Sequence, residues 1–142
     1  MITSFDLIWQ DCSLHDLNDL SEEKTNVHRK RCTIMCAQYD GYSQVIRSGV
    51  AQIDKDTVER LFALLEQFIT EVKVDREKFA QVVCDCSNWI LRIRNSSCAV
   101  QKYEGIVFYP SSVKPITAIM QDALLAADVQ PMLFGWHDHH EE

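Results

Sequence analysis

The sequence predicts an α+β fold in which a largely antiparallel sheet of about six strands carries two helices on one face. Short β-prone runs alternate with turn-forming residues, an Asp-Gly pair joins two of these runs, and two stretches have the apolar spacing of amphipathic helices. A length of 142 residues and a hydrophobic content of 46% fit one core. We therefore expect a single domain over residues 1–142, with residues 137–142 as a flexible acidic and histidine-rich tail.

The N-terminal half is expected to begin with strands. Residues 5–12 have the apolar and aromatic composition of a strand, whereas residues 13–30 are polar and charged without a sustained period, which predicts an ordered loop or a short helix. Residues 31–39 and 42–53 flank Asp40-Gly41. Because both positions of such a turn tolerate positive φ, this pair predicts a hairpin.

Residues 54–72 change to a helical period, and Asp56 followed by Glu59 resembles a capping box at the start of this helix. The apolar residues that recur at three- and four-residue spacing are Val58, Leu61, Phe62, Leu65, Phe68, Ile69 and Val72.

The second half is expected to add three strands and a helix. Strands are predicted over residues 79–86, 89–94 and 98–109, separated by turn-forming residues at 87–88 and 95–97. A helix is expected to start at a Ser111-Ser112 cap and to accept Pro115 in its first turn. Its predicted buried residues are Val113, Ile116, Ile119, Met120, Ala123, Leu124 and Ala127, and Pro131 ends it.

The two halves have similar segments before their helices. Residues 49–53 precede the first helix, much as residues 105–109 precede the second. This similarity indicates a βββα repeat, in which both helices cover one face of the sheet and leave the other face exposed.

The chain has no motif of a known catalytic class. It lacks G-x-S-x-G, and with four glycines it has neither a phosphate-binding loop nor a dinucleotide fingerprint. We therefore expect no enzymatic activity and no cofactor. One alternative stays open, namely a small enzyme or ligand binder in which His15-Asp16 or His28 meets a thiol in the folded chain.

Cysteine and histidine residues are the candidate metal ligands. The chain shows no export signal, so its cysteines are expected to be reduced thiols: Cys12, Cys32, Cys36, Cys84, Cys86 and Cys98. The spacings of Cys32 with Cys36 and of Cys84 with Cys86 differ from those of zinc knuckles, so no metal site is predicted there. Whether His137, His139 and His140 bind a metal is left open, with an acidic tail as the alternative.

The formal net charge of -7 disfavours nucleic acid as a partner and favours a basic protein. No apolar run is long enough to cross a membrane, and a cytoplasmic location is expected.

Both ends of the chain are purely acidic, since residues 1–23 contain no Lys or Arg and none follows Lys114. If the termini lie close together, their carboxylates would form a negative face edged by two tryptophans. The predicted partner-binding residues are Trp9, Asp11, Asp16, Asp19, Glu22, Glu23, Trp136 and Asp138. The alternative is that these acidic ends only increase solubility.

Residues 82–93, which read strand, turn, Trp89 and strand, are followed by residues 102–107 running towards a helix. In this arrangement the chain resembles the small bacterial immunity proteins of contact-dependent and other polymorphic toxin systems. That resemblance implies a cytoplasmic antitoxin that covers the active site of one cognate toxin, commonly a basic nuclease. The other alternative is a homo-oligomeric interaction module, a homodimer for example, in which the uncovered face of the sheet pairs with itself.

Overall fold

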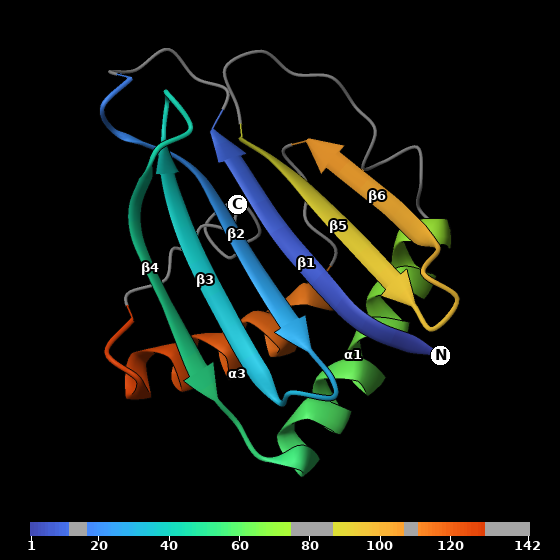
Figure 1. The fold of residues 1–142 in the computed structure, drawn as a ribbon. Coiled ribbons are helices and arrows are strands. Elements are labelled where there is room, and N and C mark those ends of the chain that lie inside the picture. Colours follow the sequence, from blue (N-terminus) through green and yellow to red (C-terminus); the bar gives the residue numbers. More distant parts are fainter. Residues whose placement is uncertain (12–16, 75–86, 107–110, 130–142) are drawn as a thin grey trace.

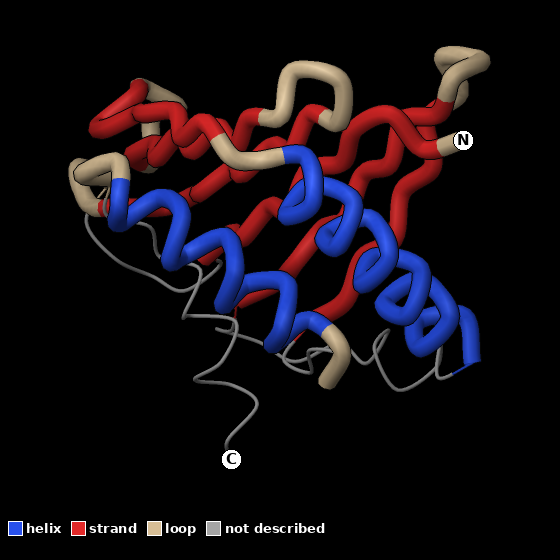
Figure 2. Tube along the Cα trace, turned by 90° about the horizontal axis from the view of Figure 1, so that it is seen from below, coloured by secondary structure: helices blue, strands red, loops and turns tan. Residues whose placement is uncertain are grey.

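The computed structural model describes residues 1–11, 17–74, 87–106 and 111–129, which form a sheet with a layer of two helices (Figures 1 and 2). In chain order the elements are β1 (Ile2–Asp11), β2 (Leu20–His28), β3 (Thr33–Asp40), β4 (Val45–Gln52), α1 (Lys55–Val74), β5 (Ser87–Asn95), β6 (Val100–Ile106) and α3 (Val113–Ala126). The predicted α+β class is confirmed, as are the six-stranded sheet and the two helices.

The six strands form one open sheet in the order β4-β3-β2-β1-β5-β6, and every neighbouring pair is antiparallel. Figure 1 looks onto the face that carries no helix, and Figure 2 shows both helices on the opposite side of the sheet. The predicted division into a covered and an uncovered face is therefore confirmed for the described elements.

The hydrophobic core lies between the helices and the covered face. Alternate residues of the central strand β1 enter it, and Phe5 packs edge-on against Phe62 of α1 with ring centroids 5.3 Å apart. Phe68 of the same helix meets Trp89 of β5 in the same way at 5.7 Å. Because side chains alternate along a strand, the residues between these core positions lie on the uncovered face.

The prediction of a loop or short helix over residues 13–30 is wrong, because β2 occupies Leu20–His28. Its covered side presents Glu23 and Thr25 before Val27, and all three are buried. A strand that buries polar side chains lacks the apolar alternation by which strands are found in a sequence. Residues 12–16 lie outside the described part of the chain.

The predicted hairpin at Asp40-Gly41 is confirmed, and β3 pairs with β4. The positive φ falls on Ser43, at 62°, rather than on the Asp-Gly pair. The Asp40 carboxylate accepts hydrogen bonds from the backbone N–H of Tyr42 at 2.9 Å and of Gln44 at 3.0 Å. A longer turn organised by an aspartate side chain thus replaces the expected two-residue turn.

Helix α1 is confirmed, but its cap differs from the prediction. The side chain of Asp54 accepts a hydrogen bond from the N–H of Thr57 at 2.7 Å, so Asp54 is the capping residue. Glu59, which the predicted capping box requires, instead binds the guanidinium group of Arg29 at 2.7 Å and 2.9 Å. The capping box of Asp56 and Glu59 is therefore wrong, and Glu59 ties α1 to the end of β2.

Helix α3 is also confirmed, with a different start. Ser112 has helical backbone angles and caps nothing with its side chain. The carboxylate of Glu71, which belongs to α1, instead accepts hydrogen bonds from the backbone N–H groups of Ser111 at 3.0 Å and Ser112 at 2.9 Å. Ala127, predicted to be buried, is the exposed C-terminal cap.

The second half confirms two of its three predicted strands. β5 and β6 cover residues 89–94 and most of 98–109, although Ser87 and Asn88 begin β5 and are not a turn. The predicted strand at 79–86, Pro131 and the tail at 137–142 lie outside the described residues. Four strands precede α1, so the predicted βββα unit does not describe the first half. Neither described helix combines the length and the apolarity that a membrane span requires.

Candidate functional site

A trough of about 530 Å³ crosses the uncovered face over β1 to β4. Strand pairing places one row of its side chains side by side, because Asp6 lies opposite Asn26, Asn26 opposite Met35, and Met35 opposite Val50. Met35 and Val50 are 50% and 54% exposed. The trough is thus apolar at the β4 side and polar towards the centre of the sheet.

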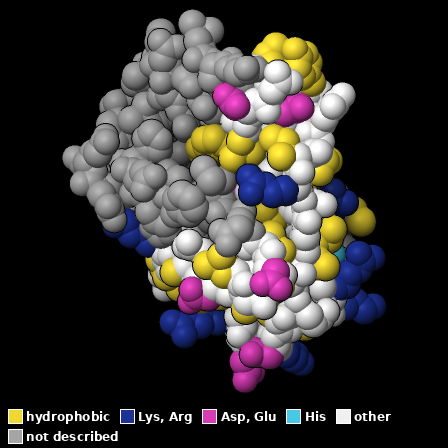
Figure 3. Space-filling model, turned by 90° about the vertical axis from the view of Figure 1, so that its left-hand side faces the viewer, with side chains coloured by type: hydrophobic (Ala, Val, Ile, Leu, Met, Phe, Trp, Pro, Cys, Tyr) yellow, Lys and Arg dark blue, Asp and Glu magenta, His cyan; other side chains and the backbone are white. Residues whose placement is uncertain are grey.

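The apolar character continues along β4, which is the edge strand of the sheet. Tyr42, Val45 and Ile46 are exposed to similar degrees as Val50, and Figure 3, which faces this edge, shows hydrophobic side chains open on its surface. Large apolar side chains that gather on a surface are typical of interaction sites, whereas isolated ones are ordinary. This patch is the main exposed apolar feature that the described residues offer.

The polar side chains around the trough are held by neighbouring groups. Asn26 donates a hydrogen bond to Asp6 Oδ1 at 2.8 Å, and Arg92 Nη2 lies 3.3 Å from Asp6 Oδ2. The ammonium group of Lys24 lies 3.6 Å from Glu22 and 5.4 Å from the ring centroid of Tyr39. These contacts reduce the number of orientations that the polar side chains can adopt, so the surface is partly preorganised for binding.

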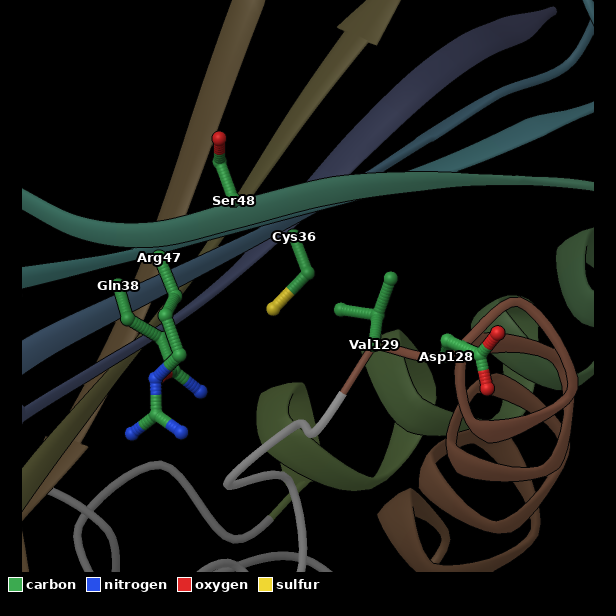
Figure 4. Close-up of a pocket in the computed structure, with 6 residues that line it drawn as sticks. All are labelled: Cys36, Gln38, Arg47, Ser48, Asp128 and Val129. Atoms are coloured by element: carbon green, nitrogen blue, oxygen red, sulfur yellow. The ribbon is translucent and has the colours of Figure 1, made fainter.

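A second cavity of about 150 Å³ lies on the helix side of the same strands. Figure 4 shows Cys36, Gln38 and Arg47 pointing into it from β3 and β4, while Val129 points towards Cys36 from the segment that follows α3. Beside it, Gln38 donates a hydrogen bond to the carboxylate of Glu23 at 2.8 Å. This hydrogen bond links two buried polar side chains across β2 and β3.

Cys36 is the thiol of this group, and its surroundings oppose ionisation. Burial, and to a smaller extent the nearby negative charge of Glu23, raise the pKa of Cys36 to about 12, against smaller lowering effects of Thr25 and Arg47. Because the thiolate and not the thiol is the nucleophile, this cysteine is in an unreactive state near neutral pH. The cavity therefore lacks an activated nucleophile among its described residues.

The reactivity of Cys36 can be measured directly. With a pKa of about 12 its thiolate fraction at pH 8 is about one in ten thousand, so iodoacetamide should label the exposed Cys98 in the native protein and leave Cys36 unmodified. Peptide mapping by mass spectrometry reads both sites, and labelling in urea should modify both. If Cys36 in the native protein were labelled as fast as Cys98, its thiol would not be buried as described.

The predicted acidic face is not assembled from the residues that the structure describes. Trp9 packs against the core on the covered face and is partly buried, and Glu23 beside it is 1% exposed, so neither projects freely from a surface. Glu22 points to the opposite face, since neighbours in a strand alternate. Asp19 is exposed in the turn before β2.

For the remaining predicted partner-binding residues, the structure does not describe the side chains, and their role stays a prediction. Asp11 ends β1, and its side chain is not described. Asp16, Trp136 and Asp138 lie outside the described residues.

The other candidate ligands are only partly described. Within the described ranges no group of three or more His, Cys, Asp or Glu side chains could hold a metal ion. Cys32, partly buried, precedes β3 with a φ of 53°, and its thiol lies 3.6 Å from the carbonyl oxygen of Arg29. His28 accepts a hydrogen bond at Nδ1 from the backbone N–H of Arg31 at 3.2 Å. His15, Cys84, Cys86 and the terminal histidines lie outside the described part.

Sequence reasoning did not predict that Met35, Val50, Arg92 and Arg94 share one face of the sheet. Met35 and Val50 lie in predicted strands, but whether their side chains are exposed depends on which face of the sheet the helices cover. The alternation of Arg92, Ile93 and Arg94 is the one available signal, because it indicates a strand with a polar face.

No protein-family model matches the chain, and no curated protein matches its sequence. The function is therefore inferred from the uncovered face and from the cavity behind β3 and β4.

Proposed function

We propose that this chain is a non-enzymatic binding protein, a cytoplasmic immunity protein that covers the active site of one basic protein toxin with the uncovered face of its sheet. The observation that supports this proposal is the trough on that face, at whose β4 side Met35 and Val50 expose half of their surface.

The trough has the composition of the centre of a protein interface. Such centres are apolar and lose their water on binding, while charged side chains remain at the rim. Here Met35 and Val50 are the apolar centre, and Asp6, Lys24 and Glu22 are the charged neighbours. A partner surface that contributes an aromatic or aliphatic side chain would fill the trough and bury this area.

Charge favours a basic partner. The formal net charge of -7 attracts a basic protein over distances longer than direct contact and raises the rate of association. The contacts at the trough then decide which basic protein stays bound.

The buried cysteine supports a binding role over catalysis. The Cys36 thiol, with a pKa of about 12 from burial, would have to lose its proton before it could attack a substrate. Its place beside Glu23, a negative neighbour, makes that loss still less favourable.

The experiment is a binding measurement between the purified chain and the purified product of the adjacent gene. Val50→Arg places a charge in the apolar part of the trough and is expected to weaken binding on the order of 100-fold, since a central interface position is changed. Isothermal titration calorimetry gives the Kd of both forms.

Leu125→Arg is the matched control, because Leu125 is 40% exposed on α3, on the opposite side of the sheet from the trough. It should bind like the unmodified chain. Light scattering tests the alternative: a homodimer that Val50→Arg dissociates would replace this proposal with the oligomeric module. Equal losses in both variants, or no binding by the unmodified chain, would contradict the trough as docking site.

A further inference from the structure

Cationic side chains gather at one end of the uncovered face, where β1 and β6 begin and β2 and β5 end (Figure 1). Strand pairing sets them in rows: Ser4 lies between His28 and Arg94, and in the next row Arg92 lies opposite Lys102. Figure 3 shows Lys and Arg side chains projecting on the right, which is the uncovered face. This gathering occurs in a chain whose net charge is -7, so composition does not account for it.

The arrangement sets like charges side by side. Directly opposed residues of an antiparallel pair have adjacent side chains, and two cations in that position repel each other. Arg92 is balanced by Asp6 at 3.3 Å and Lys102 by Glu104 at 3.5 Å. Among the described residues, the guanidinium group of Arg94 has no such partner. An anion placed beside Arg94 would therefore supply the counter-charge that this guanidinium group lacks among the described residues.

The cations surround a hollow of about 380 Å³. Its polar lining includes Ser4, Asn26, His28, Arg92 and Arg94. Both Asp6 oxygens are occupied by Asn26 and Arg92, so the one carboxylate of the hollow orients these two side chains. His28 accepts at Nδ1 from the Arg31 N–H at 3.2 Å, which leaves Nε2 as the nitrogen that donates in the neutral ring.

We infer that this hollow binds a phosphate group, either as the free ion or as a phosphomonoester. Guanidinium groups match phosphate because their planar fork donates two parallel hydrogen bonds to neighbouring oxygens. Arg94 supplies the unpaired fork, Arg92 a second cation fixed by Asp6, and His28 a donor from the neighbouring strand. A concave site lined with cations also concentrates anions near it.

The site is distinct from the proposed docking of a protein partner. It lies over β1, β2, β5 and β6, whereas the exposed apolar part of the trough lies over β3 and β4. The two share only Asp6 and Asn26. The Val50→Arg variant is expected to bind phosphate like the unmodified chain. Loss of partner binding and loss of phosphate binding can therefore be measured independently.

The test is a titration of the isotope-labelled full chain with inorganic phosphate and with phenyl phosphate, followed by NMR amide shifts. Saturable shifts around residues 4, 28 and 94 are expected, and Arg94→Gln should weaken binding about 10-fold because one charge-assisted contact is lost. Tighter binding of phenyl phosphate identifies a phosphomonoester as the ligand, and tighter binding of inorganic phosphate identifies the free ion.

Lys102→Gln is the matched control, since it removes the same charge one strand away, outside the lining of the hollow. It should change the Kd by less than about twofold, as expected for a screened surface charge. Equal losses in both variants would show diffuse attraction without a site and overturn the inference. So would the absence of saturable shifts in the unmodified chain.

Discussion

Replacing Trp89 by alanine is expected to lower the free energy of unfolding by about 3–5 kcal/mol, among the largest effects of any single substitution in this chain. The indole is 0% exposed and stands edge-on to Phe68 with centroids 5.7 Å apart. Its removal loses that aromatic contact and leaves a cavity between α1 and the sheet, which the surrounding side chains fill only in part. Urea denaturation followed by circular dichroism measures the loss.

Gly105 provides a second test of the same packing. It lies opposite Trp89 in the neighbouring strand β6, and a Cβ atom added there would lie 2.5 Å from two carbons of the indole ring. Gly105→Ala alone should therefore destabilise the chain by about 1–3 kcal/mol through overpacking.

In the Trp89→Ala background the same substitution should cost nothing, because the obstructing ring is gone and alanine restricts the unfolded chain more than glycine does. The two substitutions are thus expected to be strongly non-additive. Additive effects would show that the indole does not lie over Gly105.

Gly105 also illustrates what the sequence could and could not predict. Its strand was predicted from β-prone composition, and β6 is indeed formed there. The reason for a glycine in mid-strand is a ring from the adjacent strand, at a position that depends on the pairing of β5 with β6. Local composition carries no information on that register, so the strand was predictable and its packing was not.

The sequence did not predict strand β2, for a related reason. β2 is an interior strand, yet it buries Glu23 and Thr25 where an apolar alternation would normally stand. Gln38 on β3 makes the burial of Glu23 tolerable through a hydrogen bond of 2.8 Å. In the sequence, a polar residue such as Glu23 is therefore indistinguishable from a loop residue until its strand pairing is known.

The candidate site was the least predictable part. The predicted acidic face required the carboxylates of both chain ends to share one surface, but adjacent strand residues such as Glu22 and Glu23 point to opposite faces. The uncovered face instead combines Val50, Met35 and Arg92 from three strands. Only the order of the strands brings these residues into one row, and strand order is a tertiary property.

Replacing Glu71 by alanine should destabilise the chain by about 2 kcal/mol, because its carboxylate occupies the N-terminus of α3 in place of a capping side chain. It accepts hydrogen bonds from two backbone N–H groups and from the hydroxyls of Ser111 and Ser112. The substitution leaves the first N–H groups of α3 unsatisfied and removes a negative charge from the positive end of the helix dipole. The substitution also removes the hydrogen bonds that link α1 to the start of α3.

The effect of Glu71 should depend on pH in a defined direction. Partial burial raises the pKa of its carboxyl, but the hydrogen bonds from Ser112 and Ser111 together outweigh burial and lower the pKa below the ordinary value of 4.5. A lowered pKa in the folded state stabilises the fold above the unfolded-state pKa, and this stabilisation is lost as the pH falls through the folded-state value. The difference in unfolding free energy between the unmodified chain and Glu71→Ala should therefore be constant near neutral pH and shrink below about pH 4.5.

Two further variants separate the cap from a general effect of negative charge on α1. Glu66→Ala removes an exposed carboxylate from the same helix and should change stability by less than about 0.5 kcal/mol. Glu71→Gln keeps one acceptor oxygen but loses the charge, so it should fall between the unmodified chain and Glu71→Ala and show no pH dependence from this site. If Glu66→Ala destabilises as much as Glu71→Ala, the contacts with Ser111 and Ser112 are not what holds α3 to α1, because only Glu71 makes them among the described residues.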